Sequence, residues 1–486
     1  MLGFTKFISL EQEMLVKDVC DGLSVIGILP TGGGKSAVYI IPTIERDLTT
    51  LVISPLKSLM EDQALKLRKV GVCGIACHSG LEDSAWDAAV QAFRDARGTP
   101  RLLFAAPEMV LSKRFVEHFG GVSFDLLAVD EAHCASTWGD AFRPNYLRIK
   151  QIARRLGKPQ TVALSATIDE KILGDVKDRV FFVNVPVIVV RADPFRPNLE
   201  LSVEKPGNNQ KKVEDRNRLA RHRLMELLDG AGPAIVYCWT RNGTFSLFDK
   251  LGRALKARGY LPILYHAKIG ERDKEQALGD FLQHPKPVVF ATNAFGMGID
   301  RPDVRLLVHF DPPSTLVDYA QQIGRAGRDG LPARCVVFHH ASRIERVSNF
   351  RDFGLPTAKF VEMVYARLVY RYQKLAVAER HTFNVNGIFT QMQYAARKQI
   401  SDKNELELYL QRLVTSQSLL YRIGAIVDGE GGFEMYPLTP GSKRHLQLLE
   451  ETRMTGRKEH RETKRVLRFL EAPNPTQELL WKTLRG

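Results

Sequence analysis

Residues 25–36 read VIGILPTGGGKS, an apolar run that leads into a glycine-rich turn, a lysine and a serine, with a helical pattern after them. At such a strand-to-helix turn, glycines let backbone N–H groups approach phosphate oxygens, and the helix N-terminus adds its positive end. We expect Lys35 to contact the β- and γ-phosphates of a nucleotide and the Ser36 hydroxyl to help hold Mg²⁺. The turn itself would supply backbone contacts from Thr31, Gly32, Gly33 and Gly34. Leu29 stands where the strict P-loop pattern has glycine, so the motif needs a partner elsewhere in the chain.

That partner is Asp130-Glu131-Ala132-His133, which follows the apolar run DLLAV. A carboxylate that leaves a strand tip beside a P-loop is suited to holding Mg²⁺, and we assign this role to Asp130. A second carboxylate next to it, Glu131, is placed to polarise the attacking water. The two motifs in this order, each after a strand, predict a nucleotide-hydrolysing site.

The wider pattern of the chain predicts three domains. From Val25 to about Val190, short apolar runs alternate with longer helical patterns, which is typical of a parallel sheet covered by helices. Residues 194–217 contain a Pro-Gly-Asn-Asn turn and a charge run, after which the same alternation resumes. Beyond about Ala341 the strand pattern stops, and the chain reads as helices. The predicted fold class is therefore α/β, with tandem parallel-sheet domains at 1–193 and 194–343 and a mostly helical region at 344–486.

The last region ends in a helix over 404–420, two strands flanking Gly429-Glu430-Gly431-Gly432, and a basic helix. Helix, hairpin and helix in this order resemble a winged-helix DNA-binding module. From Gly441 to Gly486 there are eleven Lys/Arg and six Asp/Glu, a local excess of 11 − 6 = +5. A solvated surface helix explains this excess as well as a DNA contact does.

Composition narrows the class of protein. The chain has 69 Lys+Arg against 55 Asp+Glu, a net charge of +14, which favours a polyanionic partner such as nucleic acid. Charged residues at 26% and hydrophobic residues at 44% exclude collagen-like, low-complexity and mostly disordered chains. The apolar runs fall short of the ~20 residues of a membrane helix, and the N-terminus lacks a signal-peptide pattern. We therefore expect an intracellular protein without a membrane span.

The six cysteines are scattered and lie mostly in apolar contexts, which indicates reduced thiols rather than a disulfide framework. Cys73, Cys77 and His78 could form a fragment of a metal site. No second ligand pair follows them at zinc spacing, so we expect no metal there.

Further short motifs accompany the P-loop in a fixed order. They are Ser54–Gln63 (SPLKSLMEDQ), Ala106-Pro107-Glu108, Asp130–His133, Ser165-Ala166-Thr167, Tyr265-His266-Ala267, Ala291–Asp300 (ATNAFGMGID) and Gln321–Gly330 (QQIGRAGRDG). This ordered set covers about residues 3–340 and resembles the RecQ family of superfamily 2 helicases. The resemblance implies two RecA-like domains, ATP and Mg²⁺ as cofactors, and 3′→5′ movement on single-stranded DNA.

The segment after the DEAH tetrad resembles the aromatic-rich loop with which RecQ proteins sense single-stranded DNA. Trp138 and Phe142 are able to stack on unpaired bases, which all present a π-face, and Arg143 supplies positive charge. The alternative is that both rings pack the floor of the domain. The resemblance favours DNA sensing.

In the second domain, Arg325 and Arg328 lie three residues apart in a helical string and would project from one face. The resemblance implies that they reach the γ-phosphate across an interdomain cleft together with Gln322, with Arg328 as the arginine finger. It also implies that hydrolysis requires closure of that cleft. Other residues that the resemblance places at the cleft or in its coupling are Ser165, Thr167, Thr292, Gly296 and Asp300, and the residues it assigns to the DNA backbone are Ser54, Lys57 and Arg241.

The sequence departs from the family at three places. In the N-terminal adenine motif, Phe4 would stack on adenine and Gln12 would read its edge, but Ile8 stands where the family has arginine. No cysteine follows Cys335, so we predict no zinc module and no zinc. We also expect no further small helical domain after the predicted winged helix. Phe433 or Tyr436 in the predicted hairpin would act as a strand-separating wedge, since a hairpin does so in relatives.

We therefore predict an ATP-dependent DNA helicase that unwinds forked DNA in repair or recombination. We expect a monomer in the cytoplasm, associated with the nucleoid if the protein is bacterial. Two alternatives stay open: a translocase or recruitment protein that binds DNA without separating strands, and an RNA helicase. The aromatic segment at Trp138 argues against RNA, and DNA-stimulated ATP hydrolysis separates the alternatives.

Overall fold

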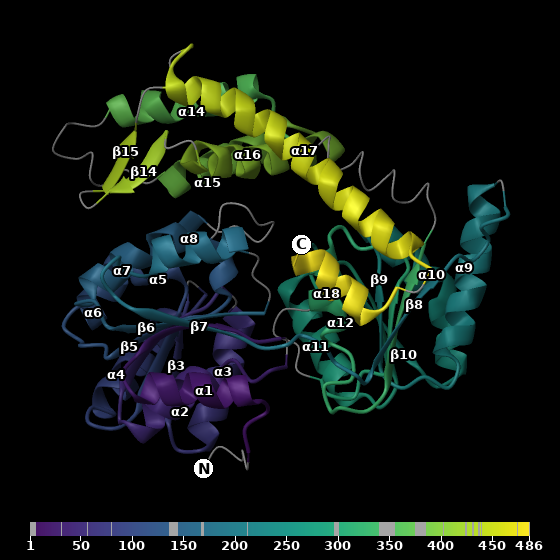
Figure 1. Cartoon of the computed structure of the whole chain (residues 1–486), viewed down its shortest axis with the longest axis horizontal. Coiled ribbons are helices and arrows are strands. Elements are labelled where there is room, and N and C mark those ends of the chain that lie inside the picture. Colours follow the sequence, from purple (N-terminus) through teal and green to yellow (C-terminus); the bar gives the residue numbers. More distant parts are fainter. Residues whose placement is uncertain are drawn as a thin grey trace. The chain divides into compact units, whose positions relative to one another are not determined.

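The computed structural model describes most of the chain. The described residues are 6–30, 32–55, 57–78, 80–135, 144–166, 170–210, 212–295, 301–339, 355–374, 385–401, 403–422, 425–429, 432–435, 438, 440–473 and 475–485. The two α/β sheets and the helical region are distinct in Figure 1. The chain forms two compact units, and one boundary between them lies between Ala192 and Asp193.

The first domain is built on a seven-stranded parallel sheet with strand order β3-β4-β2-β5-β6-β1-β7. Its strands are β1 (Ser24–Ile28), β2 (Thr49–Ile53), β3 (Cys73–Cys77), β4 (Arg101–Ala105), β5 (Leu126–Val129), β6 (Gln160–Ser165) and β7 (Val187–Arg191). Its helices are α1 (Leu10–Cys20), α2 (Ala37–Glu45), α3 (Lys57–Lys69), α4 (Asp83–Asp95), α5 (Pro107–Val110), α6 (Lys113–Phe119), α7 (Ile149–Arg155) and α8 (Glu170–Val180), with 3₁₀ turns at Ala132–Ala135 and Pro144–Arg148.

Both faces of this sheet are buried, which explains the continuous apolar runs in the sequence. Along β1, Val25 packs in the core on one face and Ile26 in the core on the other, because successive side chains point to opposite faces. Strand β6 separates β1 from β5. The segments that leave β1, β5 and β6 at their carboxyl ends therefore emerge side by side at one edge.

The second domain has a six-stranded parallel sheet of order β10-β11-β9-β12-β13-β8. Its strands are β8 (Leu199–Glu204), β9 (Ala234–Tyr237), β10 (Leu261–Tyr265), β11 (Pro287–Ala291), β12 (Leu306–His309) and β13 (Ala333–Phe338). Its helices are α9 (Val213–Leu228), α10 (Arg241–Ala257), α11 (Glu271–Gln283) and α12 (Leu316–Ile323). The predicted α/β class with two tandem parallel sheets is confirmed.

The helical region contains α14 (Ala358–Gln373), α15 (Val385–Gln399) and α16 (Lys403–Arg422), then the antiparallel pair β14 (Ile426–Gly429) and β15 (Gly432–Met435), then α17 (Lys443–Glu471). Its core includes Tyr365, Phe389, Leu413 and Leu448. The predicted order of helix, hairpin and helix is present. The assignment of a winged-helix module stays a prediction, and the side chains of Phe433 and Tyr436 lie outside the described residues.

The C-terminal end differs from the predicted third domain. Residues 460–486 pack with the second α/β domain instead. The last turns of α17 and the helix α18 (Gln477–Arg485) bury Val466, Phe469, Leu470 and Leu480 in its core. Helix α18 has an apolar face that is stabilised by burial, and it packs against α12 of the second domain. Within the described residues, no helix is long and apolar enough to cross a membrane.

Candidate active site

The predicted catalytic residues of the first domain lie at one edge of its sheet. Lys35 follows β1, Asp130 and Glu131 follow β5, and Ser165 ends the intervening strand β6. Lys35 is near enough to Asp130 for its positive charge to favour the ionised carboxylate. The parallel order of the strands thus brings together groups that lie almost a hundred residues apart in the sequence.

Gln12 braces the glycine-rich turn from helix α1. Its Nε2 donates to the carbonyl of Gly34 at 2.9 Å, and its Oε1 accepts from the backbone N–H of Ile8 at 2.8 Å. Ser9 caps α1 and also accepts from the Gln12 backbone N–H. The φ of Gly34 is +68°, a conformation that glycine adopts readily. Gln12 therefore braces the glycine-rich turn with both polar atoms of its amide held by protein, and its predicted contact with the adenine edge stays a prediction.

Asp130 is buried, and its surroundings do not favour its charge. Burial first, and then the charge of Glu131, raise the pKa of Asp130 to about 7, while Lys35 and the Glu131 N–H oppose the shift. That N–H donates to Asp130 Oδ1 at 3.0 Å. Tyr146 donates its hydroxyl to the backbone carbonyl of Asp130, which fixes the strand end.

The donor set of this edge fits Mg²⁺. The Asp130 carboxylate is a hard oxygen ligand with an unfavourable charge that a cation would offset, and Ser36 follows Lys35 in the same turn. The described residues contain no group of three or more His, Cys, Asp or Glu suited to a metal. Two protein oxygens suffice for Mg²⁺ in such sites, because it retains waters and binds substrate phosphates.

Glu131 is linked to the end of β6 through His133. Its φ of +49° lies in the left-handed region, which is uncommon for a residue with a side chain. His133 Nδ1 lies 3.3 Å from Glu131 Oε2 and 2.9 Å from Ser165 Oγ. The motif at Ser165 is thereby linked through His133 to Glu131, the residue predicted to polarise water, and the sequence alone did not indicate this link.

A hydrogen-bonded pair beside the site, Tyr39 and Gln63, had no recognisable signal in the sequence. Tyr39 of α2 donates its hydroxyl to Gln63 Oε1 of α3 at 2.5 Å. Burial raises the pKa of Tyr39, and the charge of Asp130 adds to the shift. Gln63 lies in the quoted SPLKSLMEDQ motif, but nothing in its spacing pointed to Tyr39.

In the second domain, Gln322 is buried rather than exposed at a surface. Its Oε1 lies 2.6 Å from Nε2 of His309, which is the last residue of β12. Burial lowers the pKa of His309 to about 4, so this imidazole is neutral near pH 7. Its amide thereby anchors α12 to the sheet, and the expected place of Gln322 at a nucleotide cleft stays a prediction.

Arg325 is also tied to the sheet. Tyr237 stacks on His309 with ring centroids 5.4 Å apart and donates its hydroxyl to the Phe295 carbonyl at 2.8 Å. Burial raises the pKa of Tyr237, while the charge and a hydrogen bond of Arg325 oppose that shift. The segment that carries Arg325 is thus connected with the end of the ATNAF segment through one tyrosine.

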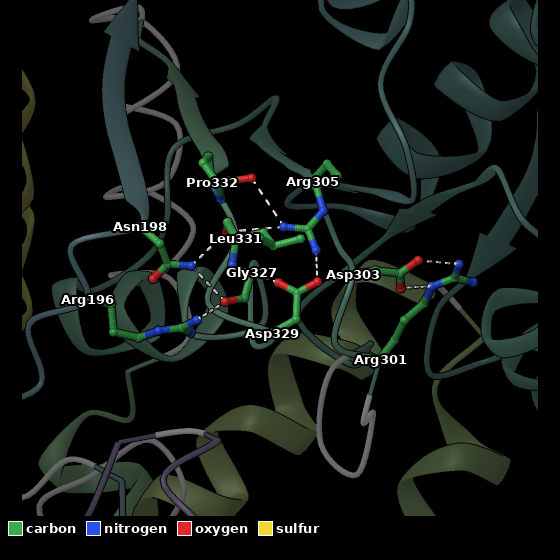
Figure 2. A network of polar contacts seen from close by, with 9 residues as sticks. All are labelled: Arg196, Asn198, Arg301, Asp303, Arg305, Gly327, Asp329, Leu331 and Pro332. Carbon is green, nitrogen blue, oxygen red and sulfur yellow. Dashed lines mark hydrogen bonds and ion pairs between the residues drawn. The ribbon is translucent and has the colours of Figure 1, made fainter. Parts of the chain in front are cut away.

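The loop at 324–332, which we call the arginine loop, carries Arg325 and Arg328. Figure 2 shows its carbonyl groups surrounded by side chains from other segments of the same domain, among them Arg196, Asn198 and Arg305. None of these three residues lies in a sequence motif that pointed to the site.

The predicted DNA-contacting residues have different environments. Lys57 is exposed at the start of α3, and Arg241 begins α10. Ser54 is only 2% exposed, so a direct contact of its hydroxyl with DNA, which we expected, does not fit its burial. Several other predicted site residues lie outside the described part of the chain: Phe4, Thr31, Trp138, Phe142, Arg143, Thr167, Gly296 and Asp300.

Two family models match this chain. The DEAD/DEAH box helicase model matches residues 9–175, and the helicase conserved C-terminal domain matches residues 220–330. Among solved structures, the Mycobacterium smegmatis helicase Lhr has a TM-score of 0.56 at 21% identity, over 71% of this chain and 47% of that one. The DEAD-box helicase Mss116 has a TM-score of 0.55 at 17% identity, over 88% of this chain and 93% of that one. The fold is therefore that of a two-domain helicase core.

Curated relatives narrow the class. The putative ATP-dependent DNA helicase Q1 of Caenorhabditis briggsae is 36% identical over 345 residues, 70% of this chain and 54% of that protein. The probable ATP-dependent DNA helicase RecS of Bacillus subtilis is 34% identical over 332 residues, 68% of this chain and 64% of that protein. The ATP-dependent DNA helicase RecQ of Bacillus subtilis is 32% identical over 336 residues, 69% of this chain and 54% of that protein. The chain thus carries both helicase domains and is similar to RecQ-family DNA helicases over about 70% of its length. It spans about half to two thirds of the length of these relatives.

Proposed function

We propose that the protein is a Mg²⁺- and ATP-dependent DNA helicase that moves 3′→5′ on single-stranded DNA and unwinds forked duplexes. The observation that carries the proposal is the assembly of Lys35, Asp130 and Glu131 at one sheet edge. These are the groups that phosphoryl transfer needs: a lysine for phosphate charge, a carboxylate for the metal and a carboxylate for the water. The similarity to proteins named as DNA helicases supports DNA as the substrate.

In the proposed reaction, Lys35 neutralises charge on the transferred phosphoryl group, and Glu131 orients and polarises the water. Asp130 and Ser36 would hold Mg²⁺, which supplies further charge neutralisation at the phosphates. Arg325 and Arg328 of the second domain would stabilise the charge that develops on the phosphoryl group. The proposal includes domain closure during each ATP cycle, because these arginines and the P-loop belong to different domains.

The first test is ATP hydrolysis by the purified protein without nucleic acid, with single-stranded DNA and with single-stranded RNA of matched length. We expect strong stimulation by DNA alone and no hydrolysis by Lys35→Ala. Stimulation by RNA alone would replace the proposal with an RNA helicase. DNA binding without stimulation would replace it with a recruitment protein.

The second test is strand separation of duplexes that carry either a 3′ or a 5′ single-stranded tail. We expect unwinding only with the 3′ tail. DNA-stimulated hydrolysis with no strand separation on either substrate would identify a translocase. Phe433→Ala tests the proposed wedge, and the wedge is refuted if this variant unwinds as well as the wild type.

We also propose that the protein acts as a monomer in the cytoplasm and that it holds no zinc. Light scattering with and without DNA measures the oligomeric state. Elemental analysis of the purified protein measures zinc, and one equivalent of bound zinc would contradict the proposal.

A further inference from the structure

Gln477, the first residue of α18, joins the C-terminal helix to the segment before β8. Its Oε1 accepts from the backbone N–H of Arg196 at 2.9 Å, and its Nε2 donates to the carbonyls of Arg196 at 2.6 Å and Leu199 at 2.8 Å. The side chain is buried. The Gln477 amide binds both the N–H and the carbonyl of Arg196. It therefore fixes the position of the Cα atom from which the Arg196 side chain extends.

Arg196 continues the connection into the arginine loop. Its guanidinium donates to the carbonyl of Gly324 at 3.2 Å and also to the carbonyl of Gly327. The carbonyl of Gly324 lies 3.4 Å from Nε of Arg328 as well. The side chain of Arg328, the predicted arginine finger, therefore shares an acceptor with a guanidinium that Gln477 places.

Two further side chains hold the same loop (Figure 2). Asn198 Nδ2 donates to the carbonyls of Gly327 at 2.7 Å and Leu331 at 2.9 Å. Arg305 donates to Leu331 and Pro332 carbonyls and pairs with Asp329. Side chains from outside the loop thus bind its backbone carbonyls at Gly324, Gly327, Leu331 and Pro332, which limits the conformations in which it can present its arginines.

Gly327 shows how closely the loop is packed. Its φ is +52°, and a Cβ at this position would lie 2.6 Å from Asn198 Nδ2 and 2.8 Å from the Leu331 carbonyl oxygen. A side chain there would displace the groups that hold the loop. The close approach is possible only with glycine.

Apolar contacts of the C-terminal segment support the helix that leads into the loop. The Phe469 ring lies 5.6 Å from the Tyr319 ring of α12, and Leu480 of α18 is fully buried in the same core. Helix α12 ends at Ile323, directly before the arginine loop. The C-terminal segment therefore contacts the loop's lead-in helix by packing and the loop itself through Arg196.

We propose that Gln477 is a positioning residue for ATP hydrolysis, which acts through Arg196 to set the conformation of the arginine loop and of Arg328. The inference rests on the proposed function. It assigns a role in the reaction to a helix that lies beyond residue 330, where the match to the helicase C-terminal model ends. The C-terminal segment is then part of the motor domain and not an appendage of the helical region.

The test compares full-length Gln477→Met with the matched control Lys482→Ala, which changes an exposed residue of the same helix. We expect Gln477→Met to lower kcat for DNA-stimulated ATP hydrolysis by about tenfold, the effect of losing about one buried hydrogen-bond group. The KM for ATP and the affinity for single-stranded DNA should stay within about twofold, because the P-loop is untouched. Lys482→Ala should match the wild type in all three.

A purely structural role is excluded by repeating the substitution in an Arg328→Ala background. If Gln477 acts through Arg328, its substitution costs nothing further there. An equal loss of kcat in both backgrounds would overturn the inference. So would an unchanged kcat in Gln477→Met while Arg328→Ala is impaired. An unchanged kcat in Arg328→Ala alone would instead contradict the proposed function at this residue.

Gln477→Glu provides a second variant if the methionine substitution weakens folding. A carboxylate in the first turn of α18 is favourable to the helix and keeps the acceptor for the Arg196 N–H, but it loses both donated bonds. We expect a melting temperature within a few degrees of wild type and a reduced kcat. A wild-type kcat in this variant would overturn the inference.

Discussion

Gln12 Nε2 donates to the carbonyl of Gly34 at 2.9 Å, so a residue of the first helix directly braces the phosphate-binding turn. A Cβ built on Gly34 would lie 2.1 Å from the same nitrogen, which shows how near the two segments are. The Gln12 amide also holds the backbone N–H of Ile8, the position where the family has arginine. With both amide atoms engaged, Gln12 contributes to the shape of the P-loop whatever base the nucleotide carries.

We therefore expect Gln12→Ala to raise the KM for both ATP and GTP by a similar factor of up to about tenfold, since one or two buried hydrogen bonds are lost. Steady-state hydrolysis with each nucleotide measures this. Glu13→Ala changes an exposed residue on the same helix and serves as the control. A rise confined to ATP would show that Gln12 reads the adenine edge.

We expect the buried charge of Asp130 to lower the stability of the folded protein. Its raised pKa of about 7 means that the folded protein keeps a proton that the unfolded chain releases between about pH 4 and pH 7. The contribution of Asp130 to stability therefore falls as pH rises through this window. Asp130→Asn removes the buried charge, so it should melt a few degrees above the wild type at about pH 8 and lose that advantage at about pH 5.

Thermal unfolding in the presence of a chelator measures this difference, and the same variant should show no ATP hydrolysis. Asp87→Asn changes an exposed carboxylate and should leave both properties unchanged. A lower melting temperature for Asp130→Asn at both pH values would contradict the assignment of a strained buried charge.

Ser165→Ala tests the link between β6 and the water-polarising carboxylate. The substitution removes the oxygen that lies 2.9 Å from His133 Nδ1, and His133 then has less to orient it beside Glu131. We expect kcat to fall by roughly three- to tenfold with little change in the KM for ATP. Ser84→Ala, at an exposed position, is the control. An unchanged kcat would mean that His133 is oriented by other groups.

Substitution of two glycines by alanine is expected to change the free energy of unfolding in opposite directions. A Cβ at Gly74 in β3 would lie 2.9 Å from the carbonyl oxygen of Ala64 and 3.1 Å from its Cα, so α3 would have to shift. We expect Gly74→Ala to lower the free energy of unfolding by about 1–3 kcal/mol. Gly174 lies inside α8 with nothing within 4 Å of a Cβ, so Gly174→Ala should raise it by about 0.5–1 kcal/mol.

Chemical denaturation measures both changes in the free energy of unfolding. Equal effects from the two substitutions would contradict the packing of α3 against β3.

The fold class and the first-domain site were readable from the sequence because their determinants are local. The glycine-rich turn, the DEAH tetrad and the apolar runs before them each report on a strand end, and parallel strands bring their carboxyl ends to one edge. Lys35, Asp130 and Glu131 could thus be predicted together without any knowledge of strand order.

Only the tertiary structure decided which partners the remaining polar groups found. Gln322 binds the buried His309, and Ser54 is buried, because burial depends on what packs above a residue and not on the motif around it. The placement of the C-terminal helix α18 also depended on the tertiary structure. Its amphipathic pattern predicts that α18 buries one side, but that pattern is the same whichever core it covers. Contact with α12 and the three hydrogen bonds of Gln477 made it part of the second helicase domain.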